Sequence, residues 1–284
     1  MKLEYIIKNE DIDKTINKII EEKYELSNRL FSKLIRNKCI YLNGKNIDTR
    51  LKPKLADKLK INLEYQEESE NIISKKIDLN IVYEDEGMLI LNKPAGIAVH
   101  PSISHYEDSL ASGVKYYFES KKIYKKIRPI NRLDLNTSGL IIYAKNEYIQ
   151  ENLIRQMKME TFKKEYLALV EGYLEKKQGI IDEPIGRKDN SIIERCIRDD
   201  GQRAITKYEV IEEKDGNSLV KCTLLTGRTH QIRVHFAFIG HPLIGDTLYG
   251  KKSEKIGRQM LHCYKLSFIH PISKKYCEFE EKMV

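Results

Sequence analysis

The sequence predicts an α+β protein: a mainly antiparallel, mixed-sheet domain flanked by helices and preceded by a small α/β-type module. Within the first 65 residues, apolar side chains recur first at helical spacing and then in alternation, which predicts two helices followed by a small sheet. The remaining chain is rich in short apolar segments bounded by Gly or charged residues. Its 284 residues are enough for one small and one large domain. We therefore expect a module at 1–65, a linker at 66–76 and a large domain at 77–284.

The N-terminal module begins with the two predicted helices. The stretch "SNRLFSKLIRNK" indicates the second helix, with Ser27 as its N-cap. "CIYLNGKNI" alternates around Asn43-Gly44, a dipeptide typical of a β-hairpin, and 59–65 alternates as a further strand. The first helix is indicated by Ile12, Ile16, Ile19 and Ile20. One face of the second helix carries Arg29, Lys33 and Arg36. The polar stretch "QEESENIISKK" then reads as the linker.

The large domain alternates strands and helices without internal repeats. Strands are predicted in "GMLILNKPAG", "GLIIYAKN", "KKEYLALVEG", "AITKYEVI" and "SLVKCTLLTG". Helices are predicted in "ENLIRQMKM" and "HQIRVHFAFIG". This mixture of short strands and helices suggests a predominantly antiparallel sheet flanked by helices.

Composition narrows the class of partner. The net charge of +8 and the isoelectric point of about 9.0 favour a polyanionic partner such as nucleic acid or an anionic membrane surface, although a Lys-rich surface kept for solubility would look similar. No apolar run is long enough to span a membrane, and no secretory signal precedes the module, so we expect a cytoplasmic protein. The five cysteines form no CxxC pair and the seven histidines no HExxH motif, which argues against a metal site.

One acidic residue stands out in a basic segment. From Ser120 to Asn146, Asp134 is the only acidic side chain. Nearby positive charge favours the ionised carboxylate, which suits a nucleophile or a base. The commoner use of Asp in such a turn is to accept hydrogen bonds from backbone amides, and the residues alone leave that interpretation ahead. The basic residues of the segment are Lys121, Lys122, Lys125, Lys126, Arg128, Arg132 and Lys145.

The whole stretch "NRLDLNTSGLIIYAKN" resembles the signature of RluA-type RNA pseudouridine synthases, H-R-L-D-x-x-T-S-G followed by an apolar strand. Four further stretches resemble motifs of that family, in family order across about 90–271. They are "LNKPAGIAVHPS", "KKEYLALVEG", "TGRTHQIRVHFAFIGHPLIGDTLYG" and "MLHCYKLSFIHP". Separately, about 13–65 resembles the S4 RNA-binding domain.

The resemblance implies that the protein isomerises uridine in RNA to pseudouridine without a cofactor or metal. Asp134 takes the position of the catalytic aspartate, which attacks either C1′ of the ribose or C6 of the base. Tyr166 takes the position of the active-site tyrosine, and Arg233 that of the arginine that pairs with the aspartate. A hydrolytic glycosidase would usually need two carboxylates, and the motifs supply one obvious acid.

Other residues are expected to bind the RNA. Arg132 resembles the residue that fills the space left when the target nucleotide is flipped out. Lys93, His100 and Arg228 are expected to line the RNA groove. The basic face of the second helix, with Arg29, Lys33 and Arg36, is expected to contact phosphates. The resemblance favours large-subunit ribosomal RNA as the substrate, with tRNA second, and a monomeric protein.

The sequence departs from the family patterns at three places. Asn131 stands where the family usually has His, a change that we expect to be tolerated. Lys38 replaces the usual Gly near the end of the second helix, and "ADKLKI" stands where "GDxI" is common. A residue other than Gly is expected to strain such a helix end.

Two other functions remain open at this point. One is a non-catalytic RNA-binding protein, which would be expected to lack Asp134, Tyr166 or Arg233. The other is a glycosidase that releases the base, which an assay for free uracil would distinguish.

Overall fold

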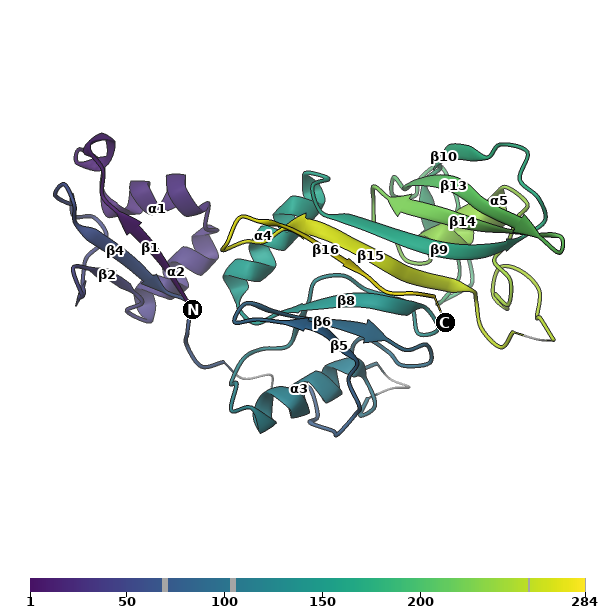
Figure 1. Ribbon diagram of the computed structural model, residues 1–284, viewed down its shortest axis with the longest axis horizontal. Coiled ribbons are helices and arrows are strands. Elements are labelled where there is room, and N and C mark those ends of the chain that lie inside the picture. The colour runs from purple at the N-terminus through teal and green to yellow at the C-terminus, as the bar shows by residue number, and fades with distance from the viewer. Residues whose placement is uncertain (68–70, 103–105, 255, 284) are drawn as a thin grey trace.

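The computed structural model describes residues 1–67, 71–102, 106–254 and 256–283. Residues 2–62 form a four-stranded antiparallel sheet with two helices, located at one end of an elongated molecule (Figure 1). Its strand order is β1-β4-β2-β3. The elements are β1 (Lys2–Ile6), the 3-10 helix η1 (Asn9–Asp11), α1 (Ile16–Tyr24), α2 (Asn28–Arg36), β2 (Ile40–Leu42), β3 (Lys45–Asn46) and β4 (Lys58–Asn62).

Local signals account for the starts of these elements. The Ser27 hydroxyl accepts a hydrogen bond from the Leu30 amide at 3.1 Å, which confirms the predicted N-cap of α2. Positive φ angles of 53° at Asn43 and 80° at Gly44 confirm the predicted hairpin. The predicted start of the first helix is wrong: Thr15 caps α1, so Ile12 lies in the turn before it and packs on the core from there.

Two residues that replace family glycines adopt the left-handed conformation. Lys38 has φ 52° and Ala56 has φ 68°. A side chain in this region costs about 1–2 kcal/mol, whereas Gly adopts it freely. The expected strain at the end of α2 is therefore present, and the loop before β4 carries a second instance.

We predict that Lys38→Gly and Ala56→Gly each raise the free energy of unfolding by about 0.5–1 kcal/mol, because relief of strain outweighs the extra backbone entropy of Gly. Urea denaturation checks this. Lys121→Gly is the matched control, because Lys121 ends α3 (Leu110–Ser120) with φ −93° and should lose stability. Equal destabilisation by Lys38→Gly and Lys121→Gly would contradict the prediction.

The start of the predicted linker is a packed segment. Glu67 is buried and accepts hydrogen bonds from Arg128 at 2.6 Å and from Lys33 at 2.7 Å. Lys33 also contacts Glu147 at 3.0 Å, so an ionic cluster joins α2 to the large domain. Residues 68–70 of the predicted linker lie outside the described residues.

A ten-stranded sheet forms the large domain. Its order is β10-β13-β14-β9-β15-β8-β6-β5, with β16 paired to β15 and β7 to β8. The strands are β5 (Ile81–Glu84), β6 (Met88–Lys93), β7 (Arg128–Pro129), β8 (Ser138–Ala144), β9 (Lys163–Glu171), β10 (Gln178–Asp182), β13 (Ile205–Lys214), β14 (Asn217–Leu224), β15 (Leu261–Ile269) and β16 (Tyr276–Glu280). All neighbours are antiparallel except β8 and β15. This confirms the mainly antiparallel, mixed α+β architecture.

The parallel contact between β8 and β15 joins the two halves of this sheet. Ser138 pairs with His262 and Gly139 with Cys263. Gly139 has φ 112°, and a Cβ atom there would overlap the Cys263 backbone. Only Gly allows the strands to approach so closely at this position.

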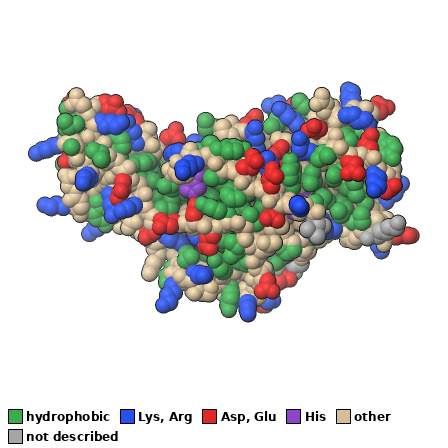
Figure 2. Space-filling view, in the orientation of Figure 1, with side chains coloured by type: hydrophobic (Ala, Val, Ile, Leu, Met, Phe, Trp, Pro, Cys, Tyr) green, Lys and Arg blue, Asp and Glu red, His purple; other side chains and the backbone are tan. Residues whose placement is uncertain are grey.

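The helices α4 (Glu147–Lys158) and α5 (Gln231–Phe238) confirm the two helices predicted for the large domain, and β11 (Ile185–Arg187) and β12 (Arg195–Ile197) form a separate hairpin. Nowhere in the described residues is there a helix with the length and apolar composition needed to cross a bilayer. On the face shown in Figure 2, basic side chains are interspersed with acidic ones rather than gathered into one patch.

Candidate active site

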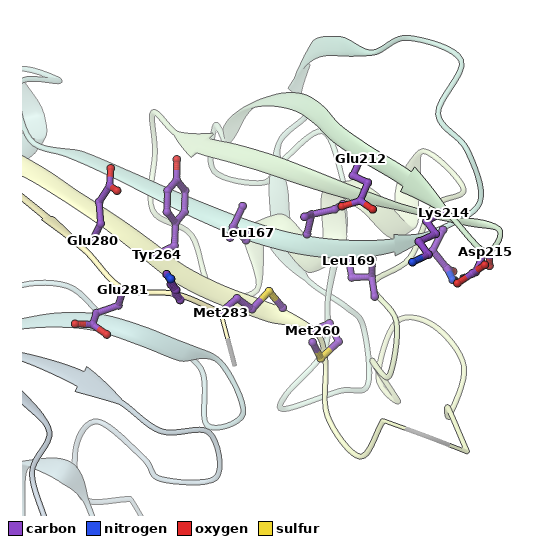
Figure 3. A pocket seen from close by; sticks show the side chains of 13 residues that line it. Leu167, Leu169, Glu212, Lys214, Asp215, Met260, Tyr264, Glu280, Glu281 and Met283 are labelled. Carbon is purple, nitrogen blue, oxygen red and sulfur yellow. Dashed lines mark hydrogen bonds between the residues drawn. The ribbon is translucent and has the colours of Figure 1, made fainter.

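Two cavities lie on opposite faces of the central sheet. Alternate residues of a strand point to opposite faces, and on β9 Lys164 and Tyr166 line one cavity while Leu167 and Leu169 line the other. The second cavity, of about 850 Å³, is largely apolar and contains neither Asp134 nor Tyr166 (Figure 3). The first, of about 550 Å³, holds the chemical groups. Its lining includes Arg132, Asp134, Lys164, Tyr166, Arg228 and His230.

Asp134 lines this first cavity, the active-site cavity, and behind it an arginine is held between two carboxylates. Nη1 of Arg233 donates to Oδ2 of Asp134 at 3.0 Å. Nε and Nη2 of Arg233 donate to the two oxygens of Asp246 at 2.7 and 2.9 Å. The predicted contact between Arg233 and Asp134 is therefore present, but the bidentate pair is with Asp246. Asp246 is fully buried and Asp134 partly exposed, so the carboxylate open to a ligand is Asp134.

Charge pairing fixes the ionisation of the two buried partners. Burial acts to lower the pKa of Arg233, but the hydrogen bonds to Asp246 and the charge of Asp134 outweigh it and raise that pKa. Burial acts to raise the pKa of Asp246, but Arg233 and two backbone amides hold it below its ordinary value. The turn that supplies these amides, at Leu248 and Tyr249, thus keeps Asp246 ionised and aimed at Arg233.

A histidine and a tyrosine complete the surroundings of Asp134. Nε2 of His230 lies 3.8 Å from Oδ2 of Asp134, and Nδ1 of His230 lies 2.7 Å from the Tyr249 hydroxyl. The Tyr249 hydroxyl accepts a hydrogen bond from the Arg195 amide at 2.8 Å, so we assign the hydroxyl proton to a bond donated to Nδ1 of His230. The imidazole proton is then on Nε2, which faces Asp134. Burial lowers the pKa of His230 although Asp134 opposes this. The ring of Tyr249 also lies 5.0 Å from the Arg233 guanidinium carbon.

Tyr166 forms part of the sheet floor of this cavity. It is 5% exposed, and its register partners are Cys222 on β14 and Cys263 on β15. Burial raises its pKa well above the ordinary value, with Cys263 and Asp134 acting in the same direction. The phenol therefore stays protonated at neutral pH and presents an aromatic face and one O–H donor.

Two side chains, those of Lys93 and Asn131, anchor the loop that carries Asp134. Nζ of Lys93 donates to the carbonyls of Pro94, Ile97 and Leu135, each at 2.9 Å. Asn131 donates to the Leu140 carbonyl and accepts from the Ile142 amide, both at 3.0 Å. The backbone carbonyl of Asp134 accepts from the Thr137 amide at 3.1 Å, while its carboxylate bonds Arg233. The interpretation of Asp134 as a side chain bonded to turn amides is therefore wrong.

The family model for RNA pseudouridylate synthases matches residues 87–238, which include Asp134, Tyr166 and Arg233. The chain belongs to this family. The synthase is 38% identical to the Bacillus subtilis protein YjbO, named as an uncharacterised RNA pseudouridine synthase, over 84% of this chain and 85% of that protein. It is 33% identical to a ribosomal large subunit pseudouridine synthase D of Nitrosomonas europaea, over 88% of this chain and 75% of that protein.

Solved structures agree with this assignment. The synthase matches human RNA pseudouridylate synthase domain containing 1 with a TM-score of 0.60 and 29% identity, over 72% of this chain and 83% of that one. It is therefore an RNA pseudouridine synthase with an α+β catalytic domain, as the sequence motifs imply.

Two expected RNA contacts do not fit the synthase in this conformation. Lys93 is fully buried, and its three donors are bound to backbone carbonyls, so it does not line a groove. Burial lowers its pKa to about 7, against the opposing charge of Asp134. Lys33 is held by Glu67 and Glu147, so its charge is already neutralised. Both lysines are structural anchors, which their sequence positions do not reveal.

The basic segment around Asp134 does not supply its electrostatic partners. Arg128 pairs with Glu67 at 2.6 Å and Lys145 with Glu84 at 2.7 Å. The positive charge beside Asp134 comes from Arg233, 99 positions away.

Other predicted RNA-binding residues remain accessible in the synthase. Arg132 and Arg228 are exposed in the lining of the active-site cavity. His100 is exposed, and partial desolvation and the positive charge of Arg132 lower its pKa. Arg29 and Arg36 are exposed on α2 and line a separate cleft beside Lys126.

Sequence reasoning missed Asp246, His230 and Tyr249 as members of the site. A signal was available, because Thr223–Gly245 contains no acid and Asp246 is the next residue. The "GDTLYG" stretch that holds Asp246 and Tyr249 was already part of a recognised motif.

Proposed function

We propose that the synthase converts uridine to pseudouridine in large-subunit ribosomal RNA, with Asp134 as the nucleophile. The observation that carries this proposal is the Asp134 carboxylate, aimed by Arg233 into a cavity with Tyr166 on its floor. An ionised carboxylate can form a covalent intermediate: attack at C6 would hold the detached uracil, whereas attack at C1′ would hold the ribose ready for bond formation with C5. Attack at C1′ and attack at C6 both remain compatible with this geometry.

The neighbouring groups have distinct proposed roles. Tyr166 packs against the uracil ring, and its hydroxyl takes part in proton transfer. Arg233 orients Asp134 through the bond from Nη1, while Asp246 holds Arg233 in place. Arg132, exposed in the cavity lining, occupies the space in the RNA that the flipped nucleotide leaves.

The choice of ribosomal RNA rests on relatives whose names specify that substrate. Besides the Nitrosomonas europaea protein, a ribosomal large subunit pseudouridine synthase D of Zymomonas mobilis is 37% identical over 69% of this chain. Transfer RNA is the second choice. Either substrate would place the enzyme in the cytoplasm.

The deciding experiment is carbodiimide mapping of pseudouridine in total RNA from strains with and without the gene. We expect at least one position in large-subunit ribosomal RNA to lose its signal, and purified enzyme to restore it without releasing uracil. A change confined to tRNA would reject the ribosomal substrate. Release of free uracil would reject isomerisation.

We further propose that the N-terminal module binds RNA phosphates through Arg29 and Arg36. The variant Arg29→Gln/Arg36→Gln should bind substrate RNA more weakly, and the slope of log K against log salt should fall by about 1.4, or roughly 0.7 for each lost contact with single-stranded RNA. The control is Lys58→Gln/Lys60→Gln, because both lysines lie on the exposed face of β4, away from α1 and α2. Equal slopes for the two double variants would contradict this role.

A further inference from the structure

Lys164 is a basic residue of the active-site cavity that has no role in the scheme above. It lies two residues before Tyr166 on β9 and therefore on the same face of the sheet. Both side chains line the active-site cavity. Nζ of Lys164 lies 3.2 Å from the position that a Cβ atom would take at Gly227, so the ammonium group reaches the loop that bears Arg228.

The ammonium group of Lys164 is half-buried without a partner. Within the residues that the structure describes, no oxygen accepts a hydrogen bond from it and no carboxylate pairs with it. Burial lowers its pKa, and the nearest opposing influence is the Cys263 thiol. A partly desolvated cation without an acceptor is unfavourable, so a ligand oxygen at this point would recover the missing interaction.

Lys164 also borders the loop that carries Gly227 and Arg228. The ammonium group is at the side of the cavity formed by the Gly227 loop, and Gly227 itself is exposed. A group that flanks the ribose and base of a bound nucleotide would reach this side while the base lies over Tyr166.

We propose that Lys164 binds a backbone phosphate of the target nucleotide, in a subsite closed on one side by Gly227. This inference rests on the proposed function, because it needs a uridine in the active-site cavity. An ammonium group binds phosphate as a point charge. The absence of a side chain at Gly227 leaves room for the ammonium and for the phosphate oxygens that it meets.

The test uses total RNA from a strain without the gene, which contains the natural unmodified substrate. Single-turnover pseudouridine formation is followed at the mapped position for wild type, Lys164→Met and Lys164→Arg. For Lys164→Met we expect the half-saturating enzyme concentration to rise about tenfold, a typical effect of one charge-assisted contact. The maximal rate should stay within about twofold, because the contact is present in both ground and transition states. Lys164→Arg should recover most of the loss.

Lys163→Met is the matched control. It removes the same charge from the neighbouring residue, which is exposed and points to the opposite face of β9. The salt dependence of binding separates a phosphate contact from a structural effect. Lys164→Met should lower the slope of log K against log salt by about 0.7, and Lys163→Met should not. Gly227→Ala, which crowds only the flexible end of Lys164, should also raise the half-saturating enzyme concentration.

Each outcome distinguishes this inference from the proposed function. If wild type modifies no RNA, the proposed function fails. If wild type is active and Lys164→Met retains the wild-type half-saturation and salt slope, only the phosphate subsite is rejected. A loss confined to the maximal rate would instead assign Lys164 to the uracil. Synthetic RNAs that carry a neutral methylphosphonate either 5′ or 3′ of the target uridine identify the phosphate. When the phosphate that Lys164 contacts is the one replaced, Lys164→Met should no longer raise the half-saturating enzyme concentration.

Discussion

Replacement of Asp134 by Asn is expected to reduce pseudouridine formation by at least about 10⁴-fold, the scale seen when a nucleophile is removed. The amide has nearly the shape of the carboxylate, and its oxygen can still accept the bond from Arg233 that the wild type makes at 3.0 Å. The site should therefore stay assembled while the nucleophile is lost. RNA affinity should remain close to that of the wild type, because Arg132 and Arg228 are unchanged.

The measurement is single-turnover isomerisation together with RNA binding. Mass spectrometry must show that the Asp134→Asn variant contains no deamidated protein, since a trace of Asp would restore activity. Asp215→Asn is the control, because Asp215 is exposed beside the other cavity, on the opposite face of the sheet. Pseudouridine formation by the verified Asp134→Asn variant at more than a trace level would reject Asp134 as the nucleophile.

Replacement of Arg233 by Leu is expected to affect both activity and stability. Asp134 would lose its orienting partner, and Asp246, with no exposed side-chain surface, would be left as an unpaired buried charge. Such a loss costs about 3–5 kcal/mol of unfolding free energy. Arg233→Lys should lose less unfolding free energy than Arg233→Leu. Its isomerisation rate should still be low, because an ammonium group cannot make the planar contacts to both carboxylates.

A double variant separates the two effects of Arg233. Arg233→Leu/Asp246→Leu removes both buried charges, so stability should recover substantially while activity should not. Urea denaturation and single-turnover rates measure the two quantities. Activity comparable to wild type in the double variant would show that the arginine is needed only to neutralise Asp246.

The pH dependence of stability gives an independent check. In the wild type the pKa of Asp246 is depressed by folding. Its contribution to the free energy of unfolding is therefore present above the unfolded-state pKa of about 3.9 and is lost as pH falls through the lower folded-state pKa. In Arg233→Leu, burial without a partner should raise that pKa. Its protonation should then shrink the stability deficit as pH falls toward about 4. A deficit independent of pH between about 4 and 8 would contradict this account.

Local sequence signals predicted the cap of α2 and the hairpin turn well, and the long-range pairing poorly. Ser27 and Asn43-Gly44 act within a few residues, so the N-cap of α2 and the hairpin could be read directly. No local pattern indicates that β15 lies parallel to β8, because that pairing depends on the approach allowed by Gly139 to Cys263. Helix α3 and eight strands were outside the predicted elements: β1, β5, β7, β10, β11, β12, β15 and β16.

The same distinction applies to the site. Family motifs predicted that Asp134 and Arg233 meet, although they are 99 positions apart. The basic segment around Asp134 misled, since Glu67 and Glu84, which neutralise Arg128 and Lys145, are about 60 positions away along the chain. Burial decided the role of Lys93, and burial is a property of the fold rather than of the motif.

The short parallel contact between β8 and β15 also bears on when the enzyme becomes active. The Ser138 hydroxyl and Nδ1 of His262 are 2.9 Å apart in space and 124 positions apart in the chain. Contacts between such distant segments form late in folding, because a long loop must close first. During translation the loop of Asp134 is made early, but its attachment to β15 must wait until Cys263 has left the ribosome. A nascent chain should therefore acquire a working site only near the end of this domain's synthesis.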